Sequence, residues 1–433
     1  MLLTDRDPGT LPRIVSSGAG TSQAETEFRS AARDGDRWRV EALPRTGRTH
    51  QVRLHARDAG FPILGDLLYG GSPFSRLCLH AEKLEFDHPA SGERLRVTAP
   101  LDFDADPSVE LCKRLWPEPD TNTWRLVHAS TEGETDWTVE RYGDWLESQS
   151  ETEPTAREIA KLERWCARLN LRGAYHKRRD RHVRGSDAES ASPVLIFGEP
   201  APERFEVREN GLGFLVSFRE GYSTGLFLDQ RDNRRRLLSG YVFPNAVDRI
   251  ADSLLDTLAG ASVLNTFAYT CSFSVAAARS GASVTSLDLS RKVLDWGGEN
   301  FRLNGLDPAA HDFIYGDCFD WMKRLAKKGR RFDLILLDPP TFSQSKQGGA
   351  FRADKDYGRL VTLALTLLAP RGILFCSTNS ATFAPDAFLD VVRREIASAG
   401  REIIDELFAP QPPDFPTGKG RPGYLKTVWL RVG

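Results

Sequence analysis

The chain has 433 residues and a mass of 48.3 kDa, so at roughly 100–200 residues per domain we expect two to four domains. Hydrophobic residues make up 40% and charged residues 27%, which is typical of a globular protein and excludes a mostly disordered or fibrous chain. Lys and Arg number 58 against 60 Asp and Glu, a net charge of −2. This balance excludes a histone-like nucleic-acid binder but not an enzyme with a local basic face.

The six cysteines contain no C-x-x-C pair, which favours reduced thiols over a disulfide framework or a zinc site. The first ten residues, MLLTDRDPGT, lack the apolar segment of a signal peptide, and no run of 18 apolar residues occurs. We therefore expect a cytoplasmic protein with no metal and no membrane association.

The first hundred residues divide into two stretches. Residues 1–27 are rich in Ser, Gly, Thr and Asp without hydrophobic periodicity, which predicts a disordered tail. Residues 28–103 are expected to form a β-rich domain, with strands at 38–43, 77–86 and 95–99.

A linker and a small α+β domain are expected next. Residues 104–122 carry three prolines and are predicted to be the linker. The domain would span residues 123–205, with a helix over 155–169. Thr155 can cap this helix, and Glu158, three residues later, completes a capping box.

The dipeptide Asn210-Gly211 lies between two short β-like runs and predicts a hairpin, because a type I′ turn needs positive φ at both central positions. We expect residues 206–236 to contain this hairpin and to cover a cofactor site. In residues 237–433 strands alternate with helices, which argues for a parallel, doubly wound α/β sheet. The expected strands are 263–267, 284–289, 312–317, 333–338 and 372–377, with a final strand within 424–432, and the expected helices are 271–280, 290–304, 318–328, 355–368 and 385–399.

Polar residues follow the first four of these strands. Ligands of open α/β sheets bind at the carboxyl ends of the strands. The first strand leads into residues 265–272, where a helix begins and offers free N–H groups to an anionic ligand. Asp288 ends the second strand, at the position of the acid that binds ribose hydroxyls in nucleoside-binding folds. Asp317 ends the third strand and could accept from an adenine amino group, and Asp338-Pro339-Pro340 ends the fourth.

Each of these residues also has a purely structural explanation, since an aspartate at a strand end often caps a helix and Asp-Pro-Pro often forms a turn. Their order at successive strand ends favours a binding site. The G-x-G-x-x-G fingerprint of dinucleotide-binding folds is absent, so a pyrophosphate is not expected. A nucleoside cofactor without pyrophosphate fits, and S-adenosylmethionine is the obvious candidate.

Residues 124–433 resemble the class I methyltransferases that modify large-subunit ribosomal RNA, the RlmI/RlmK group. The matching segments are TVERYGDWL (138–146), STGLFLDQRDNRR (223–235), VLNTFAYTCSFSVAAA (263–278), LDLSRKVLDWGGENFRLNGL (287–306), GDCFDWMKRL (316–325) and FDLILLDPPTFSQSK (332–346). The resemblance implies a Rossmann-like domain with a doubly wound, seven-stranded sheet.

The resemblance also implies roles for individual residues. Asp288 would hold the ribose and Asp317 the adenine edge, while the segment from Asp338 would face the methyl group. The first cofactor loop would be formed by Phe267, Tyr269 and Thr270, and the site would be closed from the hairpin side by Gln230, Arg231 and Arg234. Cys271 departs from the family, where this position is commonly Gly, and slightly altered cofactor packing would follow.

Residues 28–100 resemble the C-terminal part of RluA-type pseudouridine synthases. The matching segments are RTGRTHQVRLH (45–55), GDLLYG (65–70), LCLHA (77–81) and FDHPASG (86–92). The family's catalytic aspartate lies in an H-R-L-D-x-x-T-S-G stretch far upstream, and nothing here matches it well, since Asp5-Arg6-Asp7 is only a faint echo. We therefore expect a non-catalytic, RNA-facing fragment.

Basic clusters favour an RNA substrate, with large-subunit ribosomal RNA or its assembly particle as the partner. A charged solvent-exposed face would explain any one cluster, whereas three together favour phosphate contacts. The clusters are Arg172, Lys177, Arg178, Arg179, Arg181 and Arg184; Arg45, Arg48, Arg53 and Arg57; and Arg231, Arg234, Arg235 and Arg236.

The methylated atom depends on whether a nucleophilic cysteine is present. Cytosine C5 is not nucleophilic, so its methylation needs a cysteine that adds to C6. In the cytosine branch of the family this cysteine lies just past the fifth strand, a position that falls on Asn379 here. Cys376 lies three residues earlier, and because strand residues alternate between faces, it cannot substitute without a register shift. Cys376 is therefore expected in the core.

The sequence of the fourth and fifth strand ends resembles the guanine-N7 branch more closely. Guanine N7 carries an in-plane lone pair and no proton, so catalysis reduces to presenting it in line with the methyl group. Phe342 could stack on a flipped base. The expected catalytic set is Asp338, Pro339, Pro340, Phe342 and Asn379. Cytosine-C5 methylation through Cys376 is the alternative, adenine-N6 methylation comes third, and a non-catalytic RNA-binding protein or a pseudouridine synthase acting through the N-terminal fragment remains open.

Overall fold

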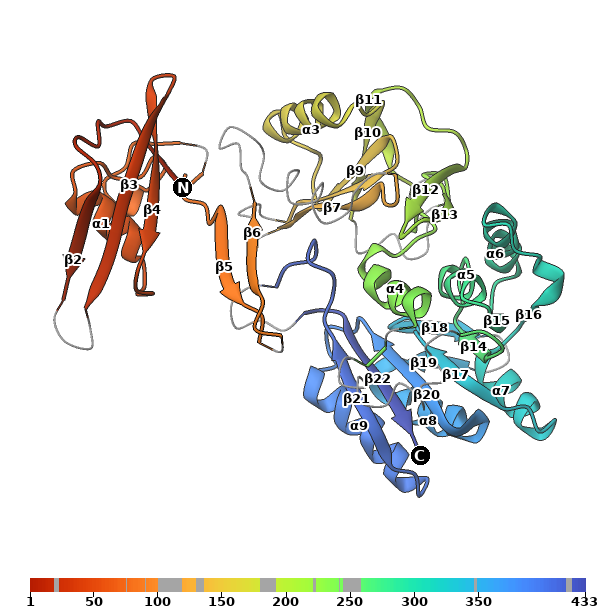
Figure 1. Ribbon diagram of the computed structural model, residues 1–433. Helices are drawn as coiled ribbons and strands as arrows, with labels where there is room; N and C mark the ends of the chain where they lie inside the picture. Colours follow the sequence, from red (N-terminus) through yellow and green to blue (C-terminus); the bar gives the residue numbers. More distant parts are fainter. Residues whose placement is uncertain are drawn as a thin grey trace. The chain divides into compact units, whose positions relative to one another are not determined.

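The computed structural model describes residues 1–18, 23–74, 76–89, 91–99, 119–129, 136–179, 192–220, 223–240, 242–243, 258–345, 349–417 and 423–433. The chain forms two compact units, Met1–Glu110 and Leu111–Gly433 (Figure 1). The second unit contains the candidate site.

The first unit is built on a four-stranded antiparallel sheet in the order β1-β4-β3-β2. Its core includes Phe28, Val40 and Phe61, each at most 1% exposed. The elements are β1 (Leu2–Thr4), β2 (Arg13–Ser17), β3 (Ala24–Asp34), β4 (Arg37–Pro44), α1 (Gln51–Asp58), the short helix η2 (Leu67–Tyr69), β5 (Lys83–Asp87) and β6 (Arg94–Thr98).

Two predictions for this unit were wrong. The expected disordered tail over residues 1–27 instead contains β1, β2 and the start of β3, and its Leu2 and Leu3 are buried, with the Leu3 N–H donating to the Cys78 carbonyl at 3.0 Å. The strand expected over 77–86 begins only at Lys83, and before it Leu79 forms an isolated bridge with Leu2. Strand β1 contributes to both errors, because its partners Val40 and Leu79 lie far along the chain.

A five-stranded sheet with the order β11-β10-β9-β8-β7 opens the second unit. Its elements are β7 (Thr123–His128), β8 (Thr138–Tyr142), β9 (Trp145–Ser150), α3 (Ala156–Leu169), β10 (Gly173–Arg178) and β11 (Val194–Gly198). The capping box between Thr155 and Glu158 at the start of α3 is confirmed. Most of the expected linker lies outside the described residues, but Thr121 and Asn122 bind the backbone of the hairpin that follows.

That hairpin, β12 (Phe205–Glu209) and β13 (Leu212–Val216), is confirmed, with φ of 53° at Asn210 and 76° at Gly211. It is followed by the short helix η5 (Leu228–Gln230) and by α4 (Arg231–Ser239).

The last part of the chain forms a seven-stranded sheet in the order β16-β15-β14-β17-β20-β22-β21 (Figure 1). The strands are β14 (Ser262–Thr266), β15 (Ser283–Asp288), β16 (Asp312–Tyr315), β17 (Phe332–Leu337), β20 (Leu368–Thr378), β21 (Ile403–Ala409) and β22 (Lys426–Val432). The helices are α5 (Ser272–Arg279), α6 (Arg291–Leu303), η7 (Pro308–Ala310), α7 (Cys318–Lys327), α8 (Ala353–Leu367) and α9 (Pro385–Ser398), and a small hairpin, β18 (Phe342–Ser345) and β19 (Gly349–Arg352), follows β17.

The sheet is mixed rather than wholly parallel, because β22 runs antiparallel to both β20 and β21. The final strand was predicted, but β21 was not. Alternate residues of the central strands enter two separate cores, so that Val263 packs with α5 and α6 while Leu264 packs with α7, α8 and α9. Helices therefore cover both faces of the sheet. From β14 the chain adds β15 and β16 on one side and then β17 and β20 on the other, so the strand order switches direction between β14 and β17, where α/β sheets bind ligands.

Candidate active site

Asp288, the last residue of β15, is a fixed hydrogen-bond acceptor. Its Oδ2 accepts the backbone N–H of Tyr269 at 2.9 Å, and its Oδ1 accepts that of Ser290 at 2.8 Å. Burial raises the pKa of Asp288, and these N–H groups oppose the rise by stabilising the carboxylate. The carboxylate is thus oriented by backbone groups and keeps lone pairs for a ligand.

The loop between β14 and α5 has an unusual backbone. Phe267, Tyr269 and Cys271 have φ values of 54°, 50° and 63°, so left-handed residues alternate along it. Such conformations are strained for residues other than glycine and persist where the surroundings fix them. Here the Thr270 hydroxyl donates to the Gly225 carbonyl at 2.6 Å, and the Asn300 amide donates to the Thr270 carbonyl at 2.9 Å.

The expected cofactor loop therefore lies beside Asp288, as the strand order required. The ring of Phe227, which is 49% exposed, lies 5.3 Å from that of Tyr269. The segment between the hairpin and α4 thus reaches this loop.

Asp317 is the N-cap of α7, where its Oδ1 accepts the N–H of Asp320 at 3.1 Å. This is the structural explanation that the sequence left open. The residue still lies at the carboxyl end of β16, next to Asp288, whose carbonyl accepts the Gly316 N–H at 2.9 Å. Gly316 is required here, because a Cβ at this position would lie 2.4 Å from Trp321 Nε1.

Asp338 lies at the end of β17 beside a buried polar chain. Gln230 Nε2 donates to Asp338 Oδ2 at 3.2 Å and to Ser377 Oγ at 2.8 Å. Asn233 Nδ2 donates to Gln230 Oε1 at 2.8 Å, and Trp429 Nε1 donates to Asn233 Oδ1 at 2.9 Å. The segment after the hairpin therefore holds the catalytic candidate Asp338 through Gln230.

The electrostatics of Asp338 follow from its burial. Desolvation raises the pKa of Asp338 to about 6, the contact with Ser377 opposes this, and the nearby charge of Asp229 adds to it. Burial therefore favours the protonated form of Asp338 more than for an exposed aspartate.

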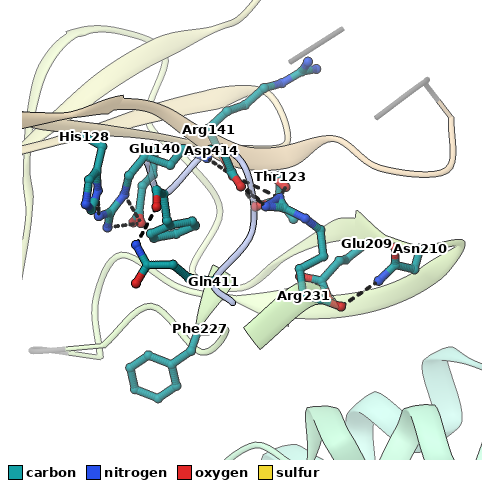
Figure 2. A network of polar contacts seen from close by, with 12 residues as sticks. Thr123, His128, Glu140, Arg141, Glu209, Asn210, Phe227, Arg231, Gln411 and Asp414 are labelled. Carbon is teal, nitrogen blue, oxygen red and sulfur yellow. Dashed lines mark hydrogen bonds and ion pairs between the residues drawn. The ribbon is translucent and has the colours of Figure 1, made fainter. Parts of the chain in front are cut away.

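Arg231 and Arg234, predicted to bind the cofactor, lie in buried ion pairs. Arg231 is paired with Asp414, with both side chains at most 1% exposed (Figure 2). Arg234 holds Glu209 with two bonds of 2.6 and 2.7 Å and also donates to the Phe227 carbonyl at 2.7 Å. Neither guanidinium can contact RNA phosphates, so this part of the third basic cluster was wrongly interpreted. Of the first cluster, Arg181 and Arg184 lie outside the described residues.

Figure 2 also shows that the loop carrying Gln411 and Asp414 meets β7 and β8 at His128 and Glu140. Asp414 Oδ2 accepts the backbone N–H of Arg125 at 2.9 Å, and the Arg125 guanidinium binds Glu140. The five-stranded sheet is thereby joined to the seven-stranded sheet within the second unit.

The ends of β17 and β20 meet at the predicted catalytic turn. The Thr341 hydroxyl donates to Asn379 Oδ1 at 2.8 Å. Pro339 is buried, Pro340 is exposed, and Phe342 is 53% exposed. The structure therefore brings Asn379 to the turn that begins at Asp338.

Cys376 lies in the interior of β20 and has no exposed surface. It is in register with Leu337 on one side and Val428 on the other. Burial raises the pKa of its thiol well above the usual range. The predicted core position of Cys376 is therefore confirmed. Asn379, in contrast, is exposed.

Sequence reasoning missed several residues of this region. Leu289, directly after Asp288, is 42% exposed at the strand end. Its position next to the predicted ribose-binding acid was a signal that could have identified it as a site residue. Asp229 and Tyr424 are joined by a 2.8 Å hydrogen bond between residues 195 positions apart, which no local pattern reveals.

Two negative findings concern the described part of the chain. It contains no group of three or more His, Cys, Asp or Glu side chains arranged to hold a metal ion. Within the same residues, every helix is too short or too polar to cross a membrane.

A model of the S-adenosylmethionine-dependent methyltransferase family matches residues 142–431, and the chain belongs to this family. It is 33% identical over 320 residues to "Ribosomal RNA large subunit methyltransferase" of Deinococcus radiodurans, covering 72% of this chain and 73% of that protein. It is 34% identical over 320 residues to "Ribosomal RNA large subunit methyltransferase I" of Aeromonas salmonicida, covering 71% and 74%. Among solved structures, SMU.776, described as a methyltransferase complexed with SAH, aligns with a TM-score of 0.63 at 29% identity, over 75% of this chain and 79% of that one.

The chain's own residues fit S-adenosylmethionine, the cofactor that the sequence predicted. Asp288 presents an oriented carboxylate suited to the two ribose hydroxyls, and exposed Leu289 beside it offers an apolar surface to a base. The loop after β14 turns through side-chain-bearing residues rather than the glycines that let a backbone approach a pyrophosphate. The fold, the site and the family therefore agree on this cofactor, and the chain is an enzyme.

Proposed function

We propose that this protein methylates guanine N7 in large-subunit ribosomal RNA, as free RNA or within an assembling particle. The names of the relatives support the RNA class. The observation that carries the choice of atom is that all five cysteines of the described residues are buried. A cytosine-C5 enzyme needs an accessible thiolate to attack C6, whereas N7 alkylation needs none.

Methylation of N7 requires no acid–base or covalent catalysis from the protein. S-adenosylmethionine supplies an electrophilic methyl group on a sulfonium. The N7 lone pair lies in the plane of the base and carries no proton, so no general base is needed. The protein contributes by fixing the position and angle of approach, an effect of orientation.

Named residues would provide this orientation. Asp288 would anchor the ribose of the cofactor through its fixed carboxylate. Pro339 and Pro340 restrict the backbone after β17, and the Thr341–Asn379 hydrogen bond ties this turn to β20. Gln230 would hold Asp338 beside the reacting centre.

The target guanine must leave its helix. In A-form RNA the major-groove edge that carries N7 is deep and narrow, so a paired guanine is inaccessible to the enzyme. An unpaired or flipped base can stack on an aromatic side chain. Phe342 is half exposed at the start of β18 and would provide that surface.

For residues 1–103 we propose an RNA-docking role without isomerase activity. Leu67 and Leu68 are 71% and 67% exposed, which is unusual for large apolar side chains, and Tyr69 follows them. The guanidinium groups of Arg53 and Arg57 lie 4.8 and 5.6 Å from the Tyr69 ring. Arg53 is held by Asp66, so Arg57 is the more exposed of the two cations. Exposed leucines and a half-buried tyrosine beside a cation suit single-stranded RNA.

The alternative, cytosine-C5 methylation through Cys376, would require β20 to shift its register and expose a core residue. The two functions are separated by incubating the full-length protein with labelled S-adenosylmethionine and large-subunit RNA, followed by mass spectrometry of the digested nucleosides. The expected product is 7-methylguanosine, and 5-methylcytidine would overturn the proposal.

A further inference from the structure

Asp229, in the short helix η5, presents a carboxylate with one oxygen unused. Its Oδ2 accepts the Tyr424 hydroxyl at 2.8 Å. Its Oδ1 has no hydrogen-bond partner among the described residues, and the side chain keeps part of its surface accessible. Half-buried carboxylate oxygens normally find donors within the protein, so an unused one calls for an explanation.

Contacts of the neighbouring residue place Asp229 near Asp338. Gln230, the next residue, donates to Asp338, and the charge of Asp229 is close enough to raise the pKa of Asp338. The two guanidinium groups whose charge acts on Asp229 belong to Arg234 and Arg125. Arg234 is bound to Glu209, and Arg125 is bound to Glu140. The Asp229 carboxylate therefore has no dedicated cation among the described residues, which leaves its second oxygen for a ligand.

The free bases differ in what they offer to such a carboxylate. The Watson–Crick edge of guanine presents two adjacent donors, N1–H and the N2 amino group, on the side of the purine opposite N7. Cytosine and adenine each place a ring acceptor next to their amino group, and a carboxylate repels that acceptor. Uracil has one N–H between two carbonyl groups.

We propose that Asp229 binds the Watson–Crick edge of the target guanine and so selects guanine at this site; this inference rests on the proposed N7 function. With Asp229 on one edge and the Asp338 turn on the side of the methyl group, the base would be held across its width. Tyr424 is then a positioning residue, since its hydroxyl fixes the orientation of the Asp229 carboxylate.

The test uses inosine, which keeps N7 and N1–H but lacks the N2 amino group. Large-subunit RNA is transcribed with inosine replacing about one guanosine in ten, which leaves most base pairs intact. After reaction with the full-length protein, the ratio of 7-methylguanosine to 7-methylinosine, corrected for incorporation, gives the relative kcat/KM from internal competition. Loss of one charge-assisted hydrogen bond predicts that the wild type favours guanosine by about tenfold or more.

Asp229→Asn keeps an acceptor for the Tyr424 hydroxyl but loses the second acceptor for the base. We expect its preference for guanosine to fall to within about threefold of unity, with cofactor affinity unchanged in calorimetry. Tyr424→Phe keeps the carboxylate but removes the hydroxyl that orients it, so its preference for guanosine should fall part of the way toward unity. A purely structural role for Asp229 would lower methylation of both bases equally.

The outcomes separate this inference from the proposed function. If the wild type forms 7-methylguanosine with no preference over inosine, the role of Asp229 is overturned and N7 methylation still stands. This result does not depend on any variant being folded. An unchanged preference in Asp229→Asn overturns it as well. Absence of both 7-methylpurines in the wild type overturns the proposed function together with this inference.

Discussion

Gly297 of α6 lies against the thiol of Cys271, so that a Cβ at position 297 would come within 2.4 Å of Cys271 Sγ. Cys271 ends the cofactor loop with φ of 63° and precedes α5. The next residue, Gly298, has open surroundings, with Arg302 Nη1 at 3.9 Å as the nearest atom to such a Cβ. Helix α6 can therefore approach the loop only because position 297 has no side chain.

This contact predicts opposite effects for two neighbouring substitutions. Gly297→Ala should lower the free energy of unfolding by about 1–3 kcal/mol through overpacking and weaken cofactor binding. Gly298→Ala should be neutral or stabilise the helix by up to about 1 kcal/mol. Denaturant titration and calorimetry measure both. Adding Cys271→Gly to Gly297→Ala should restore part of the loss, and an unaffected Gly297→Ala protein would contradict the packing.

Asp288→Ala should weaken the binding of S-adenosylmethionine by about 1.5–3 kcal/mol, because it removes a charged acceptor for the ribose. Asp312→Ala is the control, since Asp312 is an exposed aspartate at the opposite end of a neighbouring strand. Titration calorimetry on both variants gives the comparison. Equal affinities for wild type and Asp288→Ala would remove Asp288 from the site.

Asp338→Asn should stabilise the fold at neutral pH while it impairs methyl transfer. The pKa of Asp338 is raised to about 6 by burial, whereas an unfolded aspartate titrates at about 4. The folded state thus holds the proton more tightly, so the stability contributed by this group is full below about pH 4 and is lost as the pH rises through about 6. The variant should gain about 1–3 kcal/mol at pH 7.5 and less at pH 5 in urea titrations. A variant that is destabilised equally at both pH values would argue against a buried, ionised Asp338.

Cys376→Ser should remain an active methyltransferase, with a loss of about 1–2 kcal/mol in stability from burying a hydroxyl in the β20 core. RNA containing 5-fluorocytosine gives an independent readout, because covalent addition at C6 would trap a protein–RNA adduct from which fluorine cannot leave as a proton. We expect no adduct with either protein. An adduct that forms with the wild type and disappears with Cys376→Ser would establish cytosine as the target.

The sequence predicted those parts of the fold that local patterns specify. Asn210-Gly211 defined the hairpin, Thr155 and Glu158 the start of α3, and Asp288 the end of β15, because turns, caps and strand alternation depend on neighbouring residues. Strand β1 was missed because it is stabilised by pairing with β4 and by burial, both of which involve residues far along the chain. Strand β21 contains Asp405 and Glu406, which weaken its β-like pattern, and it forms by pairing with β22.

For the candidate site, too, the sequence indicated residues placed by local patterns but not the partners of distant side chains. The strand-end acids were found because the order of a parallel sheet brings them to one edge. Arg231 and Arg234 were taken for ligand-binding cations because their carboxylate partners are 183 and 25 residues away, and a sequence does not reveal which cations are already neutralised. Asp229 was overlooked for the converse reason, since its unused oxygen is visible only once its neighbours are known.

Replacing guanosine by 7-deazaguanosine throughout a large-subunit RNA transcript tests the central claim most directly, because a carbon then stands where N7 would accept the methyl group. The account predicts methylation of unmodified RNA and of RNA containing 7-deazaadenosine, but no transfer above background to the 7-deazaguanosine RNA. Undiminished transfer to the 7-deazaguanosine RNA would contradict guanine N7 as the target.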